Sequence, residues 1–324
     1  MDRGGPRLPC GIITVELRPI IAIFGPTASG KSAIAIALAC RLEAEGTPTT
    51  IVSADSIAVY RELPILSGAP TAAERRGIRH LMIGIRSVTE GFSAGEYAGE
   101  VHPLIDSEIH GGRQVLIVGG TGLYMRAATA GLAFRSPVPD SVRAHLADRL
   151  AREGSEALHR ELLDRDPGAA VAIVPTDGRR VTRALELLEV GMRPHDDSSG
   201  LWRAPPRHPT VTLGITRDPA DLRARIERRT SGMFAAGLEA EVRAAEALDP
   251  SPVARAAIGW EEALAGDRDR LVTRTWQFGR RQRTWMRRMP GLIEVPTRGD
   301  DPESTSSDVA RLLSALPADL HGLP

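Results

Sequence analysis

The residues best suited to chemistry form a glycine-rich loop near the start of the chain. Their sequence fits the phosphate-binding pattern G-x-x-x-x-G-K-[ST], known as a P-loop. Backbone N–H groups of residues 28–31 and the positive end of the following helix can hold phosphate oxygens, and a lysine adds charge. The hydroxyl after that lysine is the candidate Mg²⁺ ligand. The sequence therefore predicts a di- or triphosphate site made of Gly25, Pro26, Thr27, Ala28, Ser29, Gly30, Lys31 and Ser32.

The lysine of this loop stands out in the composition. Lys31 is the only lysine in the chain, and arginine supplies the other 40 of the 41 basic residues. A compact ammonium on a flexible stem reaches between phosphate oxygens inside a tight loop, where a planar guanidinium would not fit. The position of the single lysine supports a phosphate-binding role.

Two further side chains follow predicted strands. Asp55 comes after the apolar run 50–53, at the end of the strand where open α/β folds bind ligands. It could hold Mg²⁺, act as a general base, or cap a helix. Thr121 follows the run 115–118 within a glycine-rich turn, where an ATPase would often carry an acid. Its hydroxyl could donate to a phosphate or orient an attacking atom, although the turn could equally serve backbone shape alone.

Short apolar runs alternate with helical patterns and indicate the core that positions these residues. A β-branched run leads into the P-loop, and helical apolar spacing follows it over 32–45. Such buried runs are typical of parallel strands. The sequence predicts an α/β fold, a P-loop kinase-like three-layer core with a mostly parallel sheet, whose strands cover 20–24, 50–53, 115–118, 211–215 and 292–295.

No strand pattern occurs in the middle of the chain, which indicates an all-helical insertion. Its predicted helices cover 140–153, 155–165, 169–173 and 177–190. Residues 195–209 are predicted to be a linker, 220–248 one long helix, 269–288 another helix, and 297–307 a polar mobile segment. The predicted divisions are an extension over 1–19, core over 20–135, insertion over 136–195 and core again over 196–324.

Composition narrows the class of protein. The 41 basic residues balance 41 acidic ones, so any site for a polyanion must be local. The two cysteines form no CxxC pattern, and no apolar stretch approaches the roughly 20 residues of a membrane span. We expect a cytoplasmic protein, a monomer by default, with no membrane association and no obligate protein partner.

Six sequence blocks in order resemble those of the tRNA dimethylallyltransferases. They are GPTASGKS, SADSIAVYRE, VLIVGGTGLYMRA, DGRRVTRALE, RAAIGWEE and RRQRTWMRR, and the resemblance extends from residue 20 to about 292. It implies a P-loop kinase-like core with a helical insertion. It also implies transfer of a dimethylallyl group from dimethylallyl diphosphate, with Mg²⁺, to N6 of adenosine 37 in the anticodon stem-loop of tRNA. The P-loop would then hold the donor diphosphate.

The resemblance also implies roles for individual residues. Asp55 would accept the proton of the adenine amine, Thr121 would orient the reacting atoms, and Lys31 would stabilise the leaving diphosphate. The insertion and the C-terminal helices would contact tRNA. The implied tRNA-binding positions are Asp55, Ser56, Ile57, Ala58, Thr121, Arg143, Arg179, Arg180, Val181, Thr182, Arg183, Ala256, Ala257, Ile258, Gly259, Trp260, Glu261, Arg280, Arg281, Gln282, Arg283, Thr284, Trp285 and Arg287.

Some positions depart from the family pattern. Ala58 stands where a glutamine is common, and Ala69 stands where a basic residue is common. Three alternative functions share the P-loop: a small-molecule or nucleotide kinase, an adenylate dimethylallyltransferase acting on free nucleotide, and an RNA-binding protein without chemistry. The first would consume ATP, the second needs no C-terminal arginine block, and the third needs neither Asp55 nor Thr121.

Overall fold

A computed structural model describes residues 18–134, 138–194, 198–297 and 299–315. The chain divides into two compact units, one made of Met1–Ala130 with Pro206–Pro324 and the other of Gly131–Pro205. Most of the expected extension over 1–19 lies outside the described residues.

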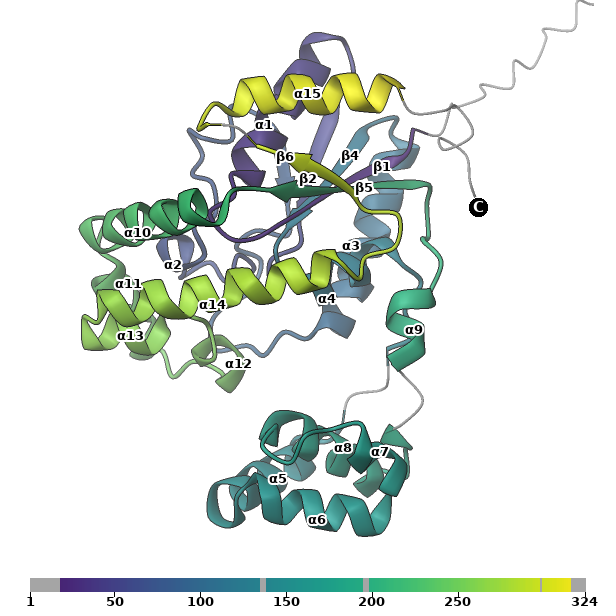
Figure 1. The fold of residues 1–324 in the computed structure, drawn as a ribbon, viewed down its shortest axis with the longest axis vertical. Helices are drawn as coiled ribbons and strands as arrows, with labels where there is room; N and C mark the ends of the chain where they lie inside the picture. Colours follow the sequence, from purple (N-terminus) through teal and green to yellow (C-terminus); the bar gives the residue numbers. More distant parts are fainter. Residues whose placement is uncertain (1–17, 135–137, 195–197, 298, 316–324) are drawn as a thin grey trace, which may run out of the picture. The chain divides into compact units, whose positions relative to one another are not determined.

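The first unit is built on one parallel sheet of six strands (Figure 1). The strand order is β3-β2-β4-β1-β5-β6, and every neighbouring pair is parallel. The predicted α/β class and five predicted strands are confirmed, whereas β3 was not predicted. The strands are β1 Ile20–Phe24, β2 Thr49–Ser53, β3 Arg79–Leu81, β4 Gln114–Gly119, β5 Thr210–Thr216 and β6 Ile293–Pro296.

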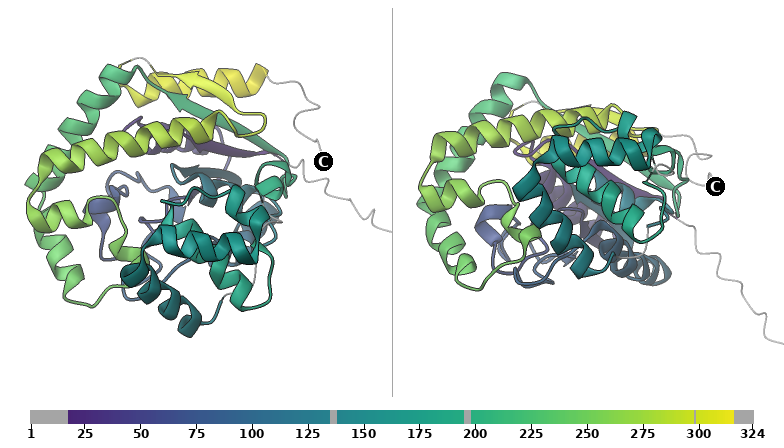
Figure 2. Two further views of the ribbon diagram at one scale, coloured as in Figure 1. Left: turned by 60° about the horizontal axis from the view of Figure 1, so that its bottom comes forward. Right: turned by 90° about the horizontal axis from the view of Figure 1, so that it is seen from below.

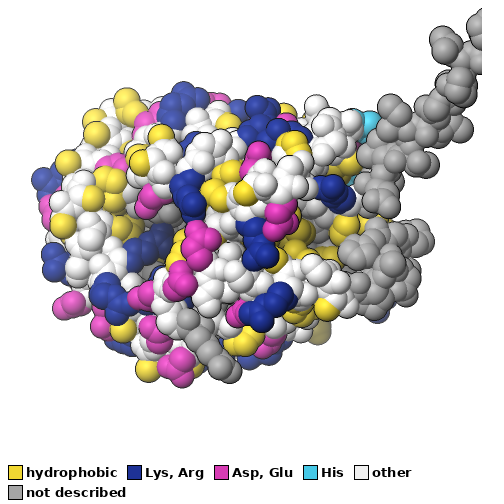
Figure 3. All heavy atoms as spheres, turned by 90° about the horizontal axis from the view of Figure 1, so that it is seen from above, with side chains coloured by type: hydrophobic (Ala, Val, Ile, Leu, Met, Phe, Trp, Pro, Cys, Tyr) yellow, Lys and Arg dark blue, Asp and Glu magenta, His cyan; other side chains and the backbone are white. Residues whose placement is uncertain are grey.

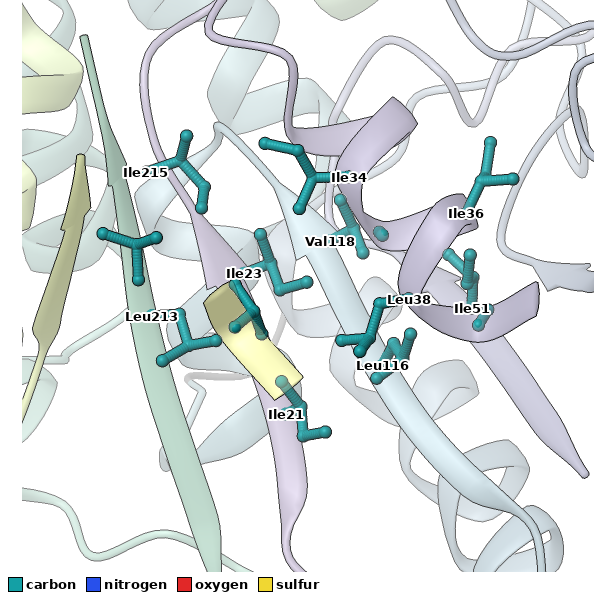
Figure 4. Close-up of a cluster of buried hydrophobic side chains, with 14 of the residues drawn as sticks. Ile21, Ile23, Ile34, Ile36, Leu38, Ile51, Leu116, Val118, Leu213 and Ile215 are labelled. Carbon is teal, nitrogen blue, oxygen red and sulfur yellow. The ribbon is translucent and has the colours of Figure 1, made fainter. Parts of the chain in front are cut away.

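Helices cover both faces of this sheet, as the three-layer prediction requires. Helix α1 (Lys31–Ala44) and helix α15 (Pro302–Ala315) pack together over one face. Their apolar side chains meet those of β1, β2, β4 and β5 in the cluster drawn in Figure 4. Helix α3 (Ala94–His110) and helix α4 (Gly122–Thr129) contact β4 and lie on the other face. Each fully buried Ile or Leu contributes about 1.5–3 kcal/mol.

Further helices of the first unit lie beside the sheet (Figure 2). Helix α10 packs along α14, and α11 and α13 pack together. The predicted single helix over 220–248 is wrong, because Gly237 takes a φ of 97° and separates α10 from α11. The helices are α10 Pro219–Ala235, α11 Leu238–Glu246, α12 Pro252–Arg255, α13 Trp260–Ala265 and α14 Arg268–Met286, with the short α2 Pro64–Ser67 before them.

The segment predicted as polar and mobile is helical in most of its length. Helix α15 begins at Pro302, within the range 297–307, and Asp301 accepts hydrogen bonds from the Glu303 and Ser304 N–H groups at 3.0 and 3.1 Å. Val309 is fully buried against the sheet. Capping and this apolar contact stabilise a segment whose polar composition suggested mobility.

The second unit is helical and has its own core. Its helices are α5 Asp140–Glu153, α6 Ser155–Arg165, α7 Pro167–Val171, α8 Gly178–Glu189 and α9 Ser198–Arg203. Leu158, Leu162, Val181 and Leu185 are fully buried within it. The prediction of a linker over 195–209 missed α9. Four of the helices fall within the ranges predicted for the insertion or within a residue or two of them.

The outer face of the molecule drawn in Figure 3 carries basic and acidic side chains intermixed with apolar ones. This agrees with the balance of 41 basic and 41 acidic residues. A local excess of positive charge therefore has to be looked for on individual helices and loops.

Candidate active site

The P-loop between β1 and α1 has the backbone conformation that a phosphate site needs. A Cβ on Gly25 would lie 2.7 Å from the carbonyl oxygen of Ile215, so β5 excludes any side chain there. Ala28 has a φ of 62° and Gly30 a φ of 96°, both in the left-handed region. Such turns direct successive N–H groups toward one point. Ser29 is fully buried, and its Oγ has no hydrogen-bond partner in the described part of the chain.

Lys31 bends back over the loop, where its Nζ donates to the Pro26 carbonyl oxygen at 2.8 Å. Burial and the nearby Arg229 guanidinium lower the pKa of Lys31 to about 8, and Asp55 opposes this shift. An ammonium that is poorly solvated and lies beside another cation favours an incoming anion. This arrangement suits the predicted diphosphate site.

Arg229 of α10 is a site residue that the sequence analysis missed. Its guanidinium donates to Thr27 Oγ1 at 3.2 Å and to the Ser67 carbonyl oxygen at 3.1 Å. Burial lowers the pKa of Arg229, and Asp55 opposes the shift. Arg229 is one of six arginines between residues 217 and 243, so its type gave no signal. Its direction in the fold singles it out.

Asp55 and Thr121 lie together at the ends of neighbouring strands. Ser53 of β2 pairs with Val118 of β4, so the two following turns are adjacent. Thr121 Oγ1 accepts from the Ser56 N–H at 3.3 Å and lies 3.4 Å from Ser56 Oγ. The sequence predicted each of these residues at the end of a strand, and the structure shows that the two strands are neighbours.

One oxygen of Asp55 is used structurally. Its Oδ1 accepts from the Ile57 N–H at 2.8 Å and from the Ala58 N–H at 3.3 Å. The cap expected as an alternative role thus exists, on a turn instead of an α-helix. Asp55 Oδ2 has no hydrogen-bond partner among the described residues and is available to a ligand.

Two buried tyrosines support the turn that carries Asp55. Tyr97 donates to the Ser53 carbonyl oxygen at 2.9 Å, and its ring lies 4.4 Å from that of Tyr124. Tyr124 donates to the Phe92 carbonyl oxygen at 3.1 Å. Burial raises the pKa of both hydroxyls, with smaller contributions from neighbouring tyrosines and Asp55. Both remain neutral donors at ordinary pH.

Glycines let α14 approach the turn after β4. A Cβ on Gly122 would collide with the ring of Trp285, and one on Gly120 would collide with the side-chain amide of Gln282. Gln282 donates to the Gly120 carbonyl oxygen at 2.8 Å, and its Oε1 accepts the Thr27 N–H at 2.7 Å. Two distant sequence blocks therefore form one structural unit.

Several implied tRNA-binding residues have buried side chains. Gln282 is 3% exposed, and Val181, Thr182, Ala257 and Trp260 are also buried. The Trp260 indole donates to Glu246 at 2.8 Å. Their side chains pack within the protein, so they offer little surface to an RNA.

The carboxyl-terminal half of α14 carries unbalanced positive charge. No acidic residue occurs from 270 to 293. The exposed arginines in this half and directly after it are Arg280, Arg281, Arg283, Arg287 and Arg288, and no carboxylate of the described residues pairs with them. In the other half, Arg270 and Arg274 pair with Glu261 and the fully buried Glu262.

In the helical unit, too, some exposed arginines have a carboxylate partner and others do not. Arg179 and Arg180 at the start of α8 are exposed, and neither pairs with a carboxylate of a described residue. Arg183 pairs with Glu186 at 2.9 Å, and Arg143 pairs with Asp140 at 2.6 Å. Among the described residues, Arg183 and Arg143 thus have a carboxylate partner, and Arg179 and Arg180 have none.

Comparison with known proteins decides the family. The model of the IPP transferase family matches residues 58–289. The chain belongs to the IPP transferase family. A tRNA dimethylallyltransferase of Thermobifida fusca is 39% identical over 293 residues, which cover 87% of this chain and 91% of that one. One of Streptomyces avermitilis is 40% identical over 282 residues, covering 84% and 88%.

Solved structures agree with the IPP transferase assignment. The full-length tRNA isopentenylpyrophosphate transferase of Bacillus halodurans is 29% identical with a TM-score of 0.66, covering 92% of this chain and 96% of that one. A eukaryotic dimethylallyltransferase acting on tRNA shares the fold, with a TM-score of 0.71 over 93% of this chain and 80% of that one at 24% identity.

The metal expected for this IPP transferase finds few protein ligands. Within the described ranges, no three His, Cys, Asp or Glu side chains group as a metal site. Ser32 is exposed in the first turn of α1. This donor set fits Mg²⁺, which usually keeps several waters and takes ligands from substrate phosphates. None of the helices described here has the length and apolar character needed to cross a bilayer.

Proposed function

We propose that this protein transfers a dimethylallyl group from dimethylallyl diphosphate to N6 of adenosine 37 in tRNA and releases diphosphate. The observation that carries the proposal is that two groups of residues lie side by side, one suited to a leaving group and the other to a nucleophile. The P-loop with Lys31 and the neighbouring Arg229 of α10 forms a cationic group, and the turns of Asp55 and Thr121 lie beside it.

The P-loop side would bind and stabilise the leaving group. The N–H groups of residues 28–31, Lys31 and Arg229 supply positive charge where negative charge develops as the allylic C–O bond breaks. The electron pair of that bond stays on the diphosphate. When bound, Mg²⁺ held by Ser32 and diphosphate oxygens supplies further charge neutralisation.

The turns that carry Asp55 and Thr121 would prepare the nucleophile. An exocyclic adenine amine is barely basic, so it reacts well only if its proton has an acceptor within hydrogen-bond reach. As N6 forms its bond to the allylic carbon, the N6 proton passes to Asp55 Oδ2, the oxygen without a partner among the described residues. The Thr121 Oγ1 lies beside Ser56, in the turn that follows Asp55. From this position its hydroxyl orients the amine.

The tRNA would be held by the arginines that have no carboxylate partner among the described residues. Guanidinium groups bind phosphate oxygens, and each contact releases counterions. Arg280, Arg281 and Arg283 on α14 and Arg179 and Arg180 on α8 supply such groups. The target base must leave its stack to reach Asp55, as in other enzymes that modify bases.

One assay tests the proposal. The purified protein is incubated with dimethylallyl diphosphate, Mg²⁺ and unmodified tRNA, and the nuclease digest is analysed by mass spectrometry for N6-dimethylallyladenosine. Parallel reactions contain AMP in place of tRNA, or ATP in place of the prenyl donor. Product in tRNA at position 37 supports the proposal. Prenylation of AMP without tRNA, or phosphoryl transfer from ATP without prenylation, contradicts it.

A further inference from the structure

We propose that Gln282 is a positioning residue that holds the P-loop and the Thr121 turn at the separation needed for transfer. The inference rests on the proposed function. Gln282 is 3% exposed, and both ends of its amide are used. The Oε1 atom accepts from the Thr27 N–H at 2.7 Å, and the Nε2 atom donates to the Gly120 carbonyl oxygen at 2.8 Å.

The two partners of this amide lie on the two sides of the proposed active site, one in the loop that binds the leaving group and the other in the turn that orients the nucleophile. Thr27 precedes residues 28–31, which are the proposed phosphate-binding part of the loop, so its own N–H can bond Gln282 without competing with the donor. Gly120 directly precedes Thr121, whose hydroxyl lies in the acceptor half. A single side chain thus joins the loop that binds the leaving group to the turn that orients the nucleophile.

Packing around Gln282 leaves little freedom for this link. A Cβ added to Gly120 would collide with the amide of Gln282 and lie 3.3 Å from the Gly25 carbonyl oxygen. A Cβ added to Gly122 would collide with Trp285, one turn further along α14. The P-loop, the turn after β4 and α14 are therefore in direct contact. Because transfer needs reacting atoms aligned at about 3–3.5 Å, a small shift of either half lowers the rate.

This role differs from the tRNA contact that the resemblance implies for the block at 280–288. Arg281 and Arg283 on either side of Gln282 are exposed, whereas the amide lies inside the protein. The neighbours can bind RNA while Gln282 sets the active-site geometry. A contact role predicts weaker tRNA binding on substitution, and a positioning role predicts slower transfer with unchanged tRNA binding.

The test compares Gln282→Met with Gln277→Met in the full chain. Methionine keeps the length of the side chain and removes both hydrogen bonds, and Gln277 is an exposed glutamine of the same helix. Single-turnover rates are measured at saturating tRNA and donor. We expect Gln282→Met to lower the rate by about 10–100-fold, with the tRNA dissociation constant within about twofold of wild type. Gln277→Met should match wild type in both.

Hydrogen exchange of the P-loop peptide gives a readout that does not need turnover. The Thr27 N–H loses its acceptor in Gln282→Met, so exchange in this peptide should become faster, and Gln277→Met should leave it unchanged. If wild type makes no prenylated tRNA, the proposed function fails, and this exchange result still tests the link. Unchanged exchange together with a normal rate in Gln282→Met overturns the inference. A raised tRNA dissociation constant with a normal rate overturns it in favour of an RNA contact.

Gln282→Glu separates positioning from a general effect on folding. An ionised carboxylate still accepts from Thr27 and cannot donate to Gly120, whereas a protonated carboxyl does both. We expect the rate of Gln282→Glu relative to wild type to rise as pH is lowered. A ratio that stays constant across pH, with folding intact, contradicts a role for the donated hydrogen bond. If Gln282→Met does not fold, this pH profile alone decides the inference.

Discussion

We expect Lys31 to make donor binding depend on pH between about 7 and 9, a range in which an ordinary lysine stays charged. Burial and then Arg229 lower the pKa of its ammonium to about 8 in the ligand-free protein. At pH 7 about nine-tenths of the molecules carry the charge, and at pH 9 about one-tenth do. A bound diphosphate favours the charged form. Binding above pH 8 therefore requires uptake of a proton, and donor affinity falls as pH rises.

The size of the expected change in donor affinity follows from the energy of the hydrogen bond between Lys31 and the diphosphate. A hydrogen bond to a charged group is worth about 1.5–3 kcal/mol, which corresponds to an affinity advantage of about 10–150-fold. Lys31→Met removes this advantage and keeps the length of the side chain. We expect wild type to bind more tightly than the variant by this factor at pH 6.5–7.5. The ratio should fall about tenfold for each pH unit above 8 until the two proteins bind alike.

Calorimetric titration with dimethylallyl diphosphate, without tRNA, measures this ratio between pH 6.5 and 9.5. The donor titrates too, but its protonation affects both proteins equally and cancels in the ratio. A ratio that is large and constant up to pH 9.5 would show that Lys31 keeps an ordinary pKa. A ratio near one at every pH would show that Lys31 does not contact the diphosphate. Either result refutes the reasoning.

Three further predictions concern the acceptor half, the packing of α14 and the RNA surface. Asp55→Asn should lower single-turnover transfer about 10²–10⁴-fold, with tRNA affinity within twofold by filter binding; a near-normal rate would show that the carboxylate is not the base. Gly122→Ala should lower the free energy of unfolding by about 1–3 kcal/mol in urea titrations, because its Cβ collides with Trp285, whereas Gly99→Ala, with open space around it, should not. Arg283→Ala should weaken tRNA binding and reduce the slope of log affinity against log salt by about one; an unchanged slope would mean that this arginine contacts no phosphate.

The sheet was predictable where burial is continuous, and less so at its edge. Strands β1, β2 and β4 are buried along their whole length, so their apolar runs were unmistakable. Strand β3 consists of Arg79, His80 and Leu81, which are exposed or half-buried, and three such residues carry no pattern. The break between α10 and α11 was missed because a glycine within a helical pattern is often tolerated, and only its φ of 97° identifies Gly237 as a helix end.

Site residues that belong to a sequence motif could be predicted. Residues that reach the site only through the fold could not. Asp55 and Thr121 were predicted because each follows a strand at the ligand-binding end of the sheet, whereas the pairing of these two strands was visible only in the fold. Arg229 could not be chosen among its arginine neighbours, since only the direction of α10 brings it to Thr27. The inward direction of Gln282 was equally hidden. Its partners, at 27 and 120, are far from it in sequence, and nothing in the block at 280–288 indicates which side chain turns inward.

The distribution of ion pairs explains how a neutral chain can bind a polyanion. Many of the arginines have a carboxylate partner, as Arg270 and Arg274 have in Glu261 and Glu262. Such pairs contribute little field at a distance. The carboxyl-terminal half of α14 has no acidic residue, so its arginines keep their charge for a ligand. Gln282 lies on the same half, turned inward. A tRNA bound to the outer face of α14 therefore rests on the element that also fixes the two halves of the active site, and we expect tRNA binding to slow hydrogen exchange in the P-loop.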